Sequence, residues 1–107
     1  MTTFDKREEG FEKKFAHDEE LRFKATARRN KLLGLWAAVK LGLAGPDADA
    51  YAKAVVAADL EEAGDGDVMR KLRRDFDAEK ISVSDQDISR TMSELMRQAV
   101  AQIQAGK

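Results

Sequence analysis

The sequence predicts an all-α protein: a compact antiparallel four-helix bundle that follows a mobile or extended helical N-terminal arm. Helix-forming residues dominate the composition, and only seven glycines and one proline occur among 107 residues. Apolar residues recur at helical spacing along most of the chain. Turn signals divide this pattern into short segments, each with an apolar face to cover, which favours a bundle.

The expected elements follow from the turn signals. Residues 1–17 should form a mobile amphipathic arm and residues 18–107 the bundle, with helices at about 18–42, 47–63, 66–79 and 85–105. The first turn surrounds Gly42, because glycine can end a helix in left-handed geometry. Pro46 then suits the first turn of the second helix.

The two later turns carry helix-capping side chains. The second turn is Gly64-Asp65-Gly66-Asp67, a tight connection with capping residues on its far side. In the third turn, Ser84 stands three positions before Asp87, which resembles a capping box with Asp in place of the usual Glu. Both signals place a new helix immediately after the turn.

Each expected helix has an apolar face. The first carries one stripe, made of Leu21, Ala25, Leu32, Leu35, Trp36, Val39 and Leu43. The third and fourth carry Val68, Met69, Leu72 and Phe76, and Ile88, Met92, Leu95, Met96, Ala99 and Ile103. The second is apolar on two sides, with Tyr51, Ala54, Val55 and Ala58 on one and Ala52, Val56 and Leu60 on the other. A helix that needs cover on two sides is expected to be central.

The arm contains three phenylalanines among charged residues. On a helix, Phe4, Phe11 and Phe15 lie within an arc of roughly 40°, and the stripe of the first helix is rotated from them by roughly 80°. A continuous helix would therefore leave the aromatic face in need of another surface, such as a partner's groove. The alternative is that the arm folds back, or kinks near Gly10 or His17, and packs on the bundle.

Charges are segregated where the arm meets the first helix. Asp18, Glu19 and Glu20 precede a basic set without an acidic residue among it, namely Arg22, Lys24, Arg28, Arg29 and Lys31. This order of charges interacts favourably with the helix dipole, so helix stability explains part of the pattern. The basic set fits a solvated outer face or a docking patch equally well.

Composition argues against an enzyme, a metal site and a cofactor. The formal net charge is −1 and cysteine is absent, which removes thiolate ligands and nucleophiles. His17 is the single histidine, so a metal site would lack the further histidine or cysteine ligands it needs. The serines likewise have no histidine nearby that could act as a base. The acidic Gly64-Asp65-Gly66 would repel a nucleotide phosphate. The N-terminus lacks a signal-peptide core and no apolar stretch is long enough to span a bilayer, so we expect a cytoplasmic protein without membrane insertion.

The first helix contains a run that resembles a known family. Residues 14–23, KFAHDEELRF, continued by residues 27–38, ARRNKLLGLWAA, look like the zeta inhibitor subunit of alphaproteobacterial F-type ATP synthases. The resemblance implies a four-helix bundle with a mobile inhibitory N-terminus. That segment would bind the catalytic head between α and β subunits, contact the γ rotor, and block ATP hydrolysis. It also implies a protein that is monomeric when free and peripheral to the inner membrane through the ATP synthase.

Carried onto this sequence, the resemblance assigns inhibition to Thr2 through about His17. Three phenylalanines would be anchors, and charged residues of the arm and of the junction up to Arg29 would be pairing groups. The implied partner-binding residues are Phe4, Lys6, Arg7, Glu8, Phe11, Lys13, Lys14, Phe15, Asp18, Arg22, Arg28 and Arg29. Gly10 is unfavourable in a helical arm, since glycine lowers helix stability by about 1 kcal/mol relative to alanine. Weaker inhibition is the consequence we expect.

Two other functions stay open at this stage. The first is a non-inhibitory scaffold or assembly factor that binds the same complex through the bundle surface. The second is a small nucleic-acid-binding regulator, which would use the basic run Met69 to Arg74 together with Arg28 and Arg29. The balanced total charge argues against a nucleic-acid partner.

Overall fold

The computed structural model describes residues 19–59 and 66–106, which form four α-helices. The helices are α2 (Glu19–Lys40), α3 (Gly45–Asp59), α4 (Gly66–Ala78) and α5 (Asp85–Gln104). Within those two ranges there is no strand, so the predicted all-α class is confirmed. α3 begins at Gly45, two residues before its expected start at 47. The predictions for the arm and for residues 60–65 lie outside the described residues.

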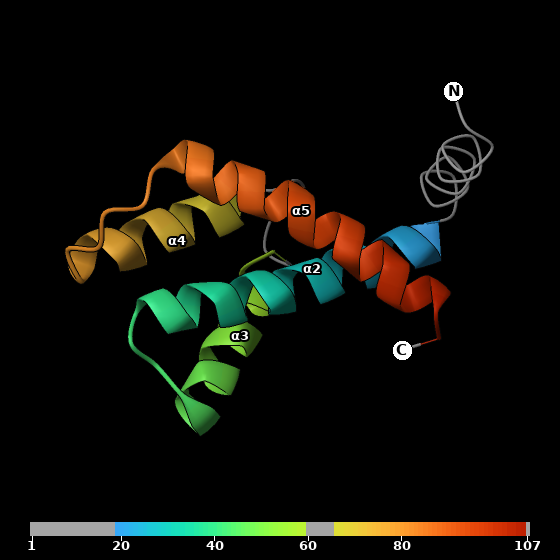
Figure 1. Cartoon of the computed structure of the whole chain (residues 1–107), viewed down its shortest axis with the longest axis horizontal. Coiled ribbons are helices and arrows are strands. Elements are labelled where there is room, and N and C mark those ends of the chain that lie inside the picture. The colour runs from blue at the N-terminus through green and yellow to red at the C-terminus, as the bar shows by residue number, and fades with distance from the viewer. Residues whose placement is uncertain (1–18, 60–65, 107) are drawn as a thin grey trace.

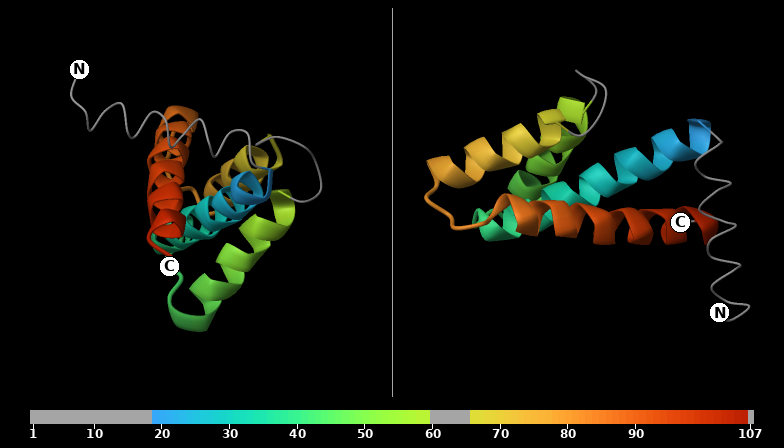
Figure 2. Two further views of the ribbon diagram at one scale, coloured as in Figure 1. Left: turned by 90° about the vertical axis from the view of Figure 1, so that its right-hand side faces the viewer. Right: turned by 90° about the horizontal axis from the view of Figure 1, so that it is seen from above.

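The principal contacts between the four helices form a ring. α2 packs on α3 and α5, and α4 packs on the same two helices. Figure 1 shows α5 running in the opposite direction to α2 and α4, with α3 crossing α2. In Figure 2, α3 and α5 lie on different sides of α2. α2 therefore holds the bundle together.

The prediction that the second helix is the central one is wrong. α3 buries two residues, Ala52 and Val55, whereas α2 buries seven. Ala54, on the side that was expected to need cover, is exposed. An alanine exposes so little apolar surface that leaving it in water costs little, so an alanine-rich side does not require a neighbour.

The core lies where all four helices meet. Its large side chains include Leu33 from α2, Val55 from α3, Leu72 and Phe76 from α4, and Ile88 from α5, all fully buried. Trp36 meets Phe76 edge to face, with ring centroids 5.9 Å apart. Burial of each such side chain stabilises the fold by about 1.5–3 kcal/mol. These contacts account for much of the stability of a small bundle.

The apolar stripe predicted for α2 is wrong in part. Val39 is 75% exposed, and Leu32, Leu35 and Trp36 are only half-buried. The buried face consists instead of Ala25, Arg29, Asn30, Leu33, Gly34, Ala37 and Ala38. Small residues on this face let α3 approach closely: a Cβ atom added to Gly34 would lie 2.5 Å from the Ala52 Cα. Backbone proximity, rather than side-chain size, decides which face of α2 is covered.

Two predicted turn signals behave as expected. Gly42 has a positive φ of 78°, and the amides of Gly42 and Leu43 donate to the carbonyls of Val39 and Ala38, which is the Schellman arrangement. At the start of α5, the Asp87 amide donates to Ser84 Oγ over 3.0 Å, so Ser84 is the N-cap. Local hydrogen bonding therefore fixes where these helices end and begin.

The end of α4 uses the same geometry without a glycine. The Lys80 amide donates to the Asp77 carbonyl, and the Ile81 amide to the Phe76 carbonyl. Lys80 has a φ of 58°, a left-handed conformation that costs a non-glycine residue about 1 kcal/mol. Ile81 packs against the core, so the hydrophobic contact of the motif compensates for this cost.

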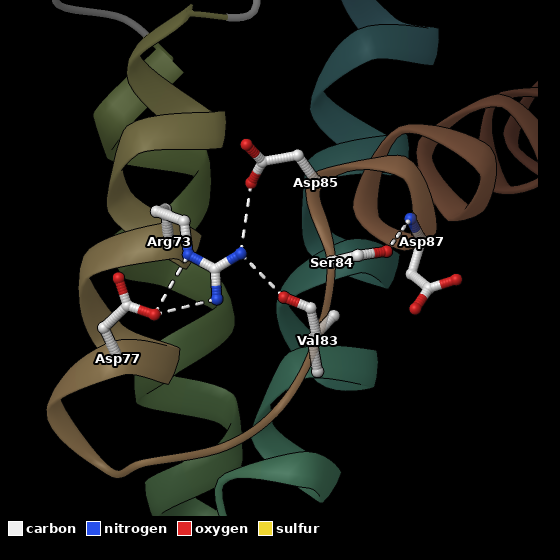
Figure 3. Close-up of polar contacts among 6 residues, drawn as sticks. All are labelled: Arg73, Asp77, Val83, Ser84, Asp85 and Asp87. Atoms are coloured by element: carbon white, nitrogen blue, oxygen red, sulfur yellow. Dashed lines mark hydrogen bonds and ion pairs between the residues drawn. The ribbon is translucent and has the colours of Figure 1, made fainter.

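Arg73 ties α4 to the turn that precedes α5 (Figure 3). Its Nη1 donates to the Val83 carbonyl over 2.6 Å and to Asp85 over 3.1 Å, while Nε donates to Asp77 over 3.1 Å. Hydrogen bonds to Asp77 and Asp85 raise the pKa of Arg73. One guanidinium thus fixes the path of the chain between the two helices.

Tyr51 connects α3 to α4. Its hydroxyl donates to Asp75 Oδ2 over 2.7 Å, and the Lys71 ammonium lies 3.1 Å from the same oxygen. Burial, together with the hydrogen bond to Asp75, raises the pKa of Tyr51. The phenol is therefore held in its protonated form in the folded protein.

Candidate functional site

Most of the predicted site residues precede α2. Nine of the twelve lie outside the described residues, namely Phe4, Lys6, Arg7, Glu8, Phe11, Lys13, Lys14, Phe15 and Asp18. Their role in binding stays a prediction. The three that the structure places are Arg22, Arg28 and Arg29, all on α2.

These three arginines do not form one patch. Arg22 is exposed, whereas Arg28 is half-buried and its Nη1 donates to Gln102 Oε1 over 3.1 Å, which links α2 to α5. Arg29 is only 4% exposed, and its Nε and Nη2 donate to Asn30 Oδ1 over 3.0 and 2.8 Å. Arg29 is therefore not part of a solvated outer face. Its guanidinium is held by hydrogen bonds within the fold.

The observed face of α2 also corrects the phase argument for the arm. Phe11 and Phe15 precede Arg29 and Leu33 by eighteen residues, which is five whole turns of an α-helix. Arg29 and Leu33 are both buried. In helical phase the phenylalanines thus fall in line with the buried face of α2 and not roughly 80° away from it. The rotation, which rested on the wrong stripe, no longer argues that the rings need a foreign surface.

Sequence reasoning missed an aromatic residue next to the arm. Phe23, near the start of α2, is 63% exposed and is one of two large hydrophobic residues in the described ranges that are mostly in water. A single exposed aromatic is common on soluble proteins. Its place in the chain is what distinguishes Phe23, since it follows the three phenylalanines of the arm and stands between Arg22 and Lys24. That flanking pattern was visible in the sequence.

A second missed feature is an open groove between α2, α4 and α5. It encloses about 660 Å³ and is lined by Arg29, Met69, Ser89, Met92, Ser93, Met96 and Arg97. Helical periodicity predicts that these methionines lie on core stripes, but only Met92 is buried, while Met69 and Met96 are half-buried. Three of the chain's four methionines meet here, a clustering that the linear sequence does not show.

The basic run of α4 is paired within its own helix. Each of three cations forms an ion pair with an aspartate three or four residues away, and these pairs are Arg70 with Asp67, Lys71 with Asp75, and Arg73 with Asp77. Carboxylates beside the cations weaken attraction for phosphate groups. This arrangement argues against the nucleic-acid alternative.

Residues 19–59 and 66–106 contain neither a candidate metal-binding cluster nor a membrane-spanning helix. No group of three or more histidines, cysteines or carboxylates there could hold a metal ion. None of the described helices combines the length and the apolar character needed to cross a membrane. The features that the described part of the chain offers are therefore surfaces: Phe23 beside the arm, and the methionine groove.

Comparisons with known proteins agree with the resemblance seen in the sequence. No curated protein matches the chain. A solution NMR structure is 46% identical, with a TM-score of 0.72, and the alignment covers 81% of this chain and 99% of that chain. The family described as ATPase inhibitor subunit zeta matches residues 1–102. That match spans the arm, α2 and nearly all of the bundle, so the chain belongs to the ATPase inhibitor subunit zeta family.

Proposed function

We propose that this protein inhibits ATP hydrolysis by the F-type ATP synthase. Its N-terminal arm would wedge between an α and a β subunit of the catalytic head and block rotation of the γ rotor in the hydrolytic direction. The observation that carries the proposal is the family match, which begins at residue 1 and so includes the arm. The protein would act as a regulator without catalysis, and it would reach the membrane only through the ATP synthase.

The bundle would hold such a wedge in a fixed position. α2 starts at Glu19, immediately after the arm, and is fixed by the core on one side and by the Arg28–Gln102 hydrogen bond to α5 on another. A helix held in this way transmits force from the arm to the whole bundle. Rotation that pushes against the wedge is resisted, while rotation that expels it is allowed.

The anchors of the wedge are the aromatic rings. Phe4, Phe11 and Phe15 would fill apolar pockets of the interface, and the exposed Phe23 would add a further ring from a different face of α2. Charged residues of the arm and Arg22 would set the register by pairing with the partner. Arg28 and Arg29 contribute by positioning α2, because their side chains are already engaged within the bundle.

The test is an assay of ATP hydrolysis by isolated catalytic head with added full-length protein. We expect the wild-type chain to lower the hydrolysis rate, and the double variant Phe11→Ala/Phe15→Ala to lose most of this effect. Truncation of one buried anchor costs about 2 kcal/mol or more of binding, which is roughly thirtyfold in affinity. The matched control is Ala50→Gly, an exposed position on α3 far from the arm in the sequence. An unchanged hydrolysis rate together with no detectable complex would refute the proposal.

A scaffold function on the same complex is the second candidate. The observation that favours it is the open groove lined by methionine and arginine, which lies on the bundle and not on the arm. The same double variant separates the two functions. A scaffold retains full activity in assembly when the rings of the arm are removed, whereas a wedge does not.

A further inference from the structure

We propose that the methionine groove is a second docking surface of this protein. It would bind an acidic segment of the catalytic head that presents apolar side chains between carboxylates, independently of the arm. This inference rests on the proposed function, because it takes the catalytic head as the partner.

The groove follows the axis of α5 for about two helical turns. Ser89, Ser93 and Arg97 succeed one another at intervals of four residues, and Met92 and Met96 form the adjacent row. From residue 89 to residue 97 the helix rises about 12 Å. The small serines keep one side open, and Met69 of α4 faces the row from the opposite wall. A helical segment with apolar residues four positions apart matches these dimensions.

Methionine makes this surface adaptable. Met92 forms the floor, with 6% of its surface exposed, and Met69 and Met96 remain half-buried in the free protein. An unbranched thioether side chain can change rotamer to fit differently shaped apolar groups, and for this reason methionine is common at binding surfaces. The half-buried methionines can therefore gain burial only when something fills the groove.

The charge of the groove selects the partner. Among the residues that the structure describes, its lining contains two arginines and no acidic residue. Arg97 is exposed and has no hydrogen bond or ion pair within the described residues, unlike Arg70, Arg73 and Arg90, which pair with aspartates. A cation left without a carboxylate beside an apolar surface favours a ligand that supplies both an apolar group and a negative charge.

Two other occupants fit less well. Docking of this groove onto the same groove of a second copy would bring like-charged arginines together across a twofold axis, which is unfavourable. The arm of the same chain carries Glu8, Glu9, Phe11 and Glu12, so its chemistry is compatible with the groove. Under the proposed function, however, the arm is held by the head when the complex forms. An acidic segment of the head is then the occupant that the groove can bind at the same time.

The experiment measures the affinity of full-length variants for isolated catalytic head, together with the inhibition reached at saturation. Arg97→Glu reverses the exposed charge of the groove, and Met96→Gln removes an apolar side chain at nearly constant length. We expect Arg97→Glu to weaken binding by about tenfold and Met96→Gln by several-fold. Inhibition at saturation should not change. The matched control is Lys53→Glu, which makes the same charge change at an exposed residue of α3 and should alter affinity less than twofold.

Each outcome decides between the proposals. Wild-type affinity in both groove variants, with thermal unfolding midpoints close to wild type, would overturn the groove and leave the arm mechanism intact. A wild-type chain that does not bind the head would overturn both. If Phe11→Ala shifts the methyl resonances of Met92 and Met96 in the free protein, the groove holds the arm and the assignment to a partner is wrong. A mass that doubles with concentration, and is restored to a monomer by Met96→Gln, would assign the groove to a second copy instead.

Discussion

The substitution Gly34→Ala tests whether close contact between backbones determines how α2 packs on α3. The new Cβ atom would lie 2.5 Å from the Ala52 Cα, 3.1 Å from the Ala52 Cβ and 3.3 Å from Val55 Cγ2. Carbon atoms in contact sit about 3.5–4.0 Å apart, so the two helices must separate by roughly 1 Å. The nearest atom belongs to the backbone, and no change of rotamer can relieve the clash.

The expected free-energy change combines two opposing effects. Overpacking of this kind costs about 1–3 kcal/mol and occasionally more, whereas alanine in place of glycine favours a helix by about 1 kcal/mol. Since a backbone clash belongs at the upper end of the overpacking range, we expect a net loss of about 2 kcal/mol. For a domain of this size the midpoint of thermal unfolding should fall by about 10 °C.

Circular dichroism at increasing temperature measures the effect, and two further variants control it. Gly66→Ala makes the same chemical change at the start of α4, where the added Cβ meets only the flexible end of Arg70, so the midpoint should hardly move. In Gly34→Ala/Ala52→Gly the 3.1 Å contact disappears but the 2.5 Å contact remains, so little stability should return. A Gly34→Ala midpoint equal to or above that of wild type would refute the reasoning.

Three predictions concern the polar contacts at the ends of helices and between them. Tyr51→Phe should lower the free energy of unfolding by about 1 kcal/mol in denaturant titrations at neutral pH. The pKa of Tyr51 is raised above its ordinary value of 10.0, so the contribution of Tyr51 to the free energy of unfolding should be retained below that pH and decline above it. In Tyr51→Phe this contribution to the decline at high pH should be absent. Lys80→Gly should raise the free energy of unfolding by about 0.5–1 kcal/mol in the same titration, because glycine adopts a positive φ without strain. A lower free energy of unfolding in Lys80→Gly would show that the lysine side chain makes a contact that offsets its backbone strain. Ser84→Ala should cost about 1 kcal/mol, and NMR titration should show the pKa of Asp87, which the Ser84 hydrogen bond lowers, moving back towards its ordinary value.

The features that the sequence predicted well are those set by local chemistry. The left-handed turn at Gly42 and the cap at Ser84 depend on hydrogen bonds between neighbouring residues, so a short stretch of sequence is sufficient to identify them. In α4 the apolar residues are few and all on one side, and Val68, Leu72 and Phe76 are buried as expected. The periodic pattern is decisive when apolar residues are scarce.

The face of α2 was not predictable in the same way. Apolar residues occur on most sides of this helix, and the pattern favoured the larger ones, including Val39, which is exposed. The covered side is instead the one where Gly34 and Ala37 allow α3 to come close. Which side of an apolar helix is covered depends on how close its neighbours come, and this information is not contained in the hydrophobicity of a single segment.

Arg29 connects the packing of α2 to the proposed surfaces. A buried guanidinium loses its hydration, and an apolar side chain of similar volume at this position would give comparable or greater stability. The bundle therefore gains little in stability from a charge here. The side chain does, however, form part of the wall of the groove, together with the exposed Arg97 and the three methionines. Under the proposal for the groove, this position links the packing of α2 to the surface that would bind an acidic segment.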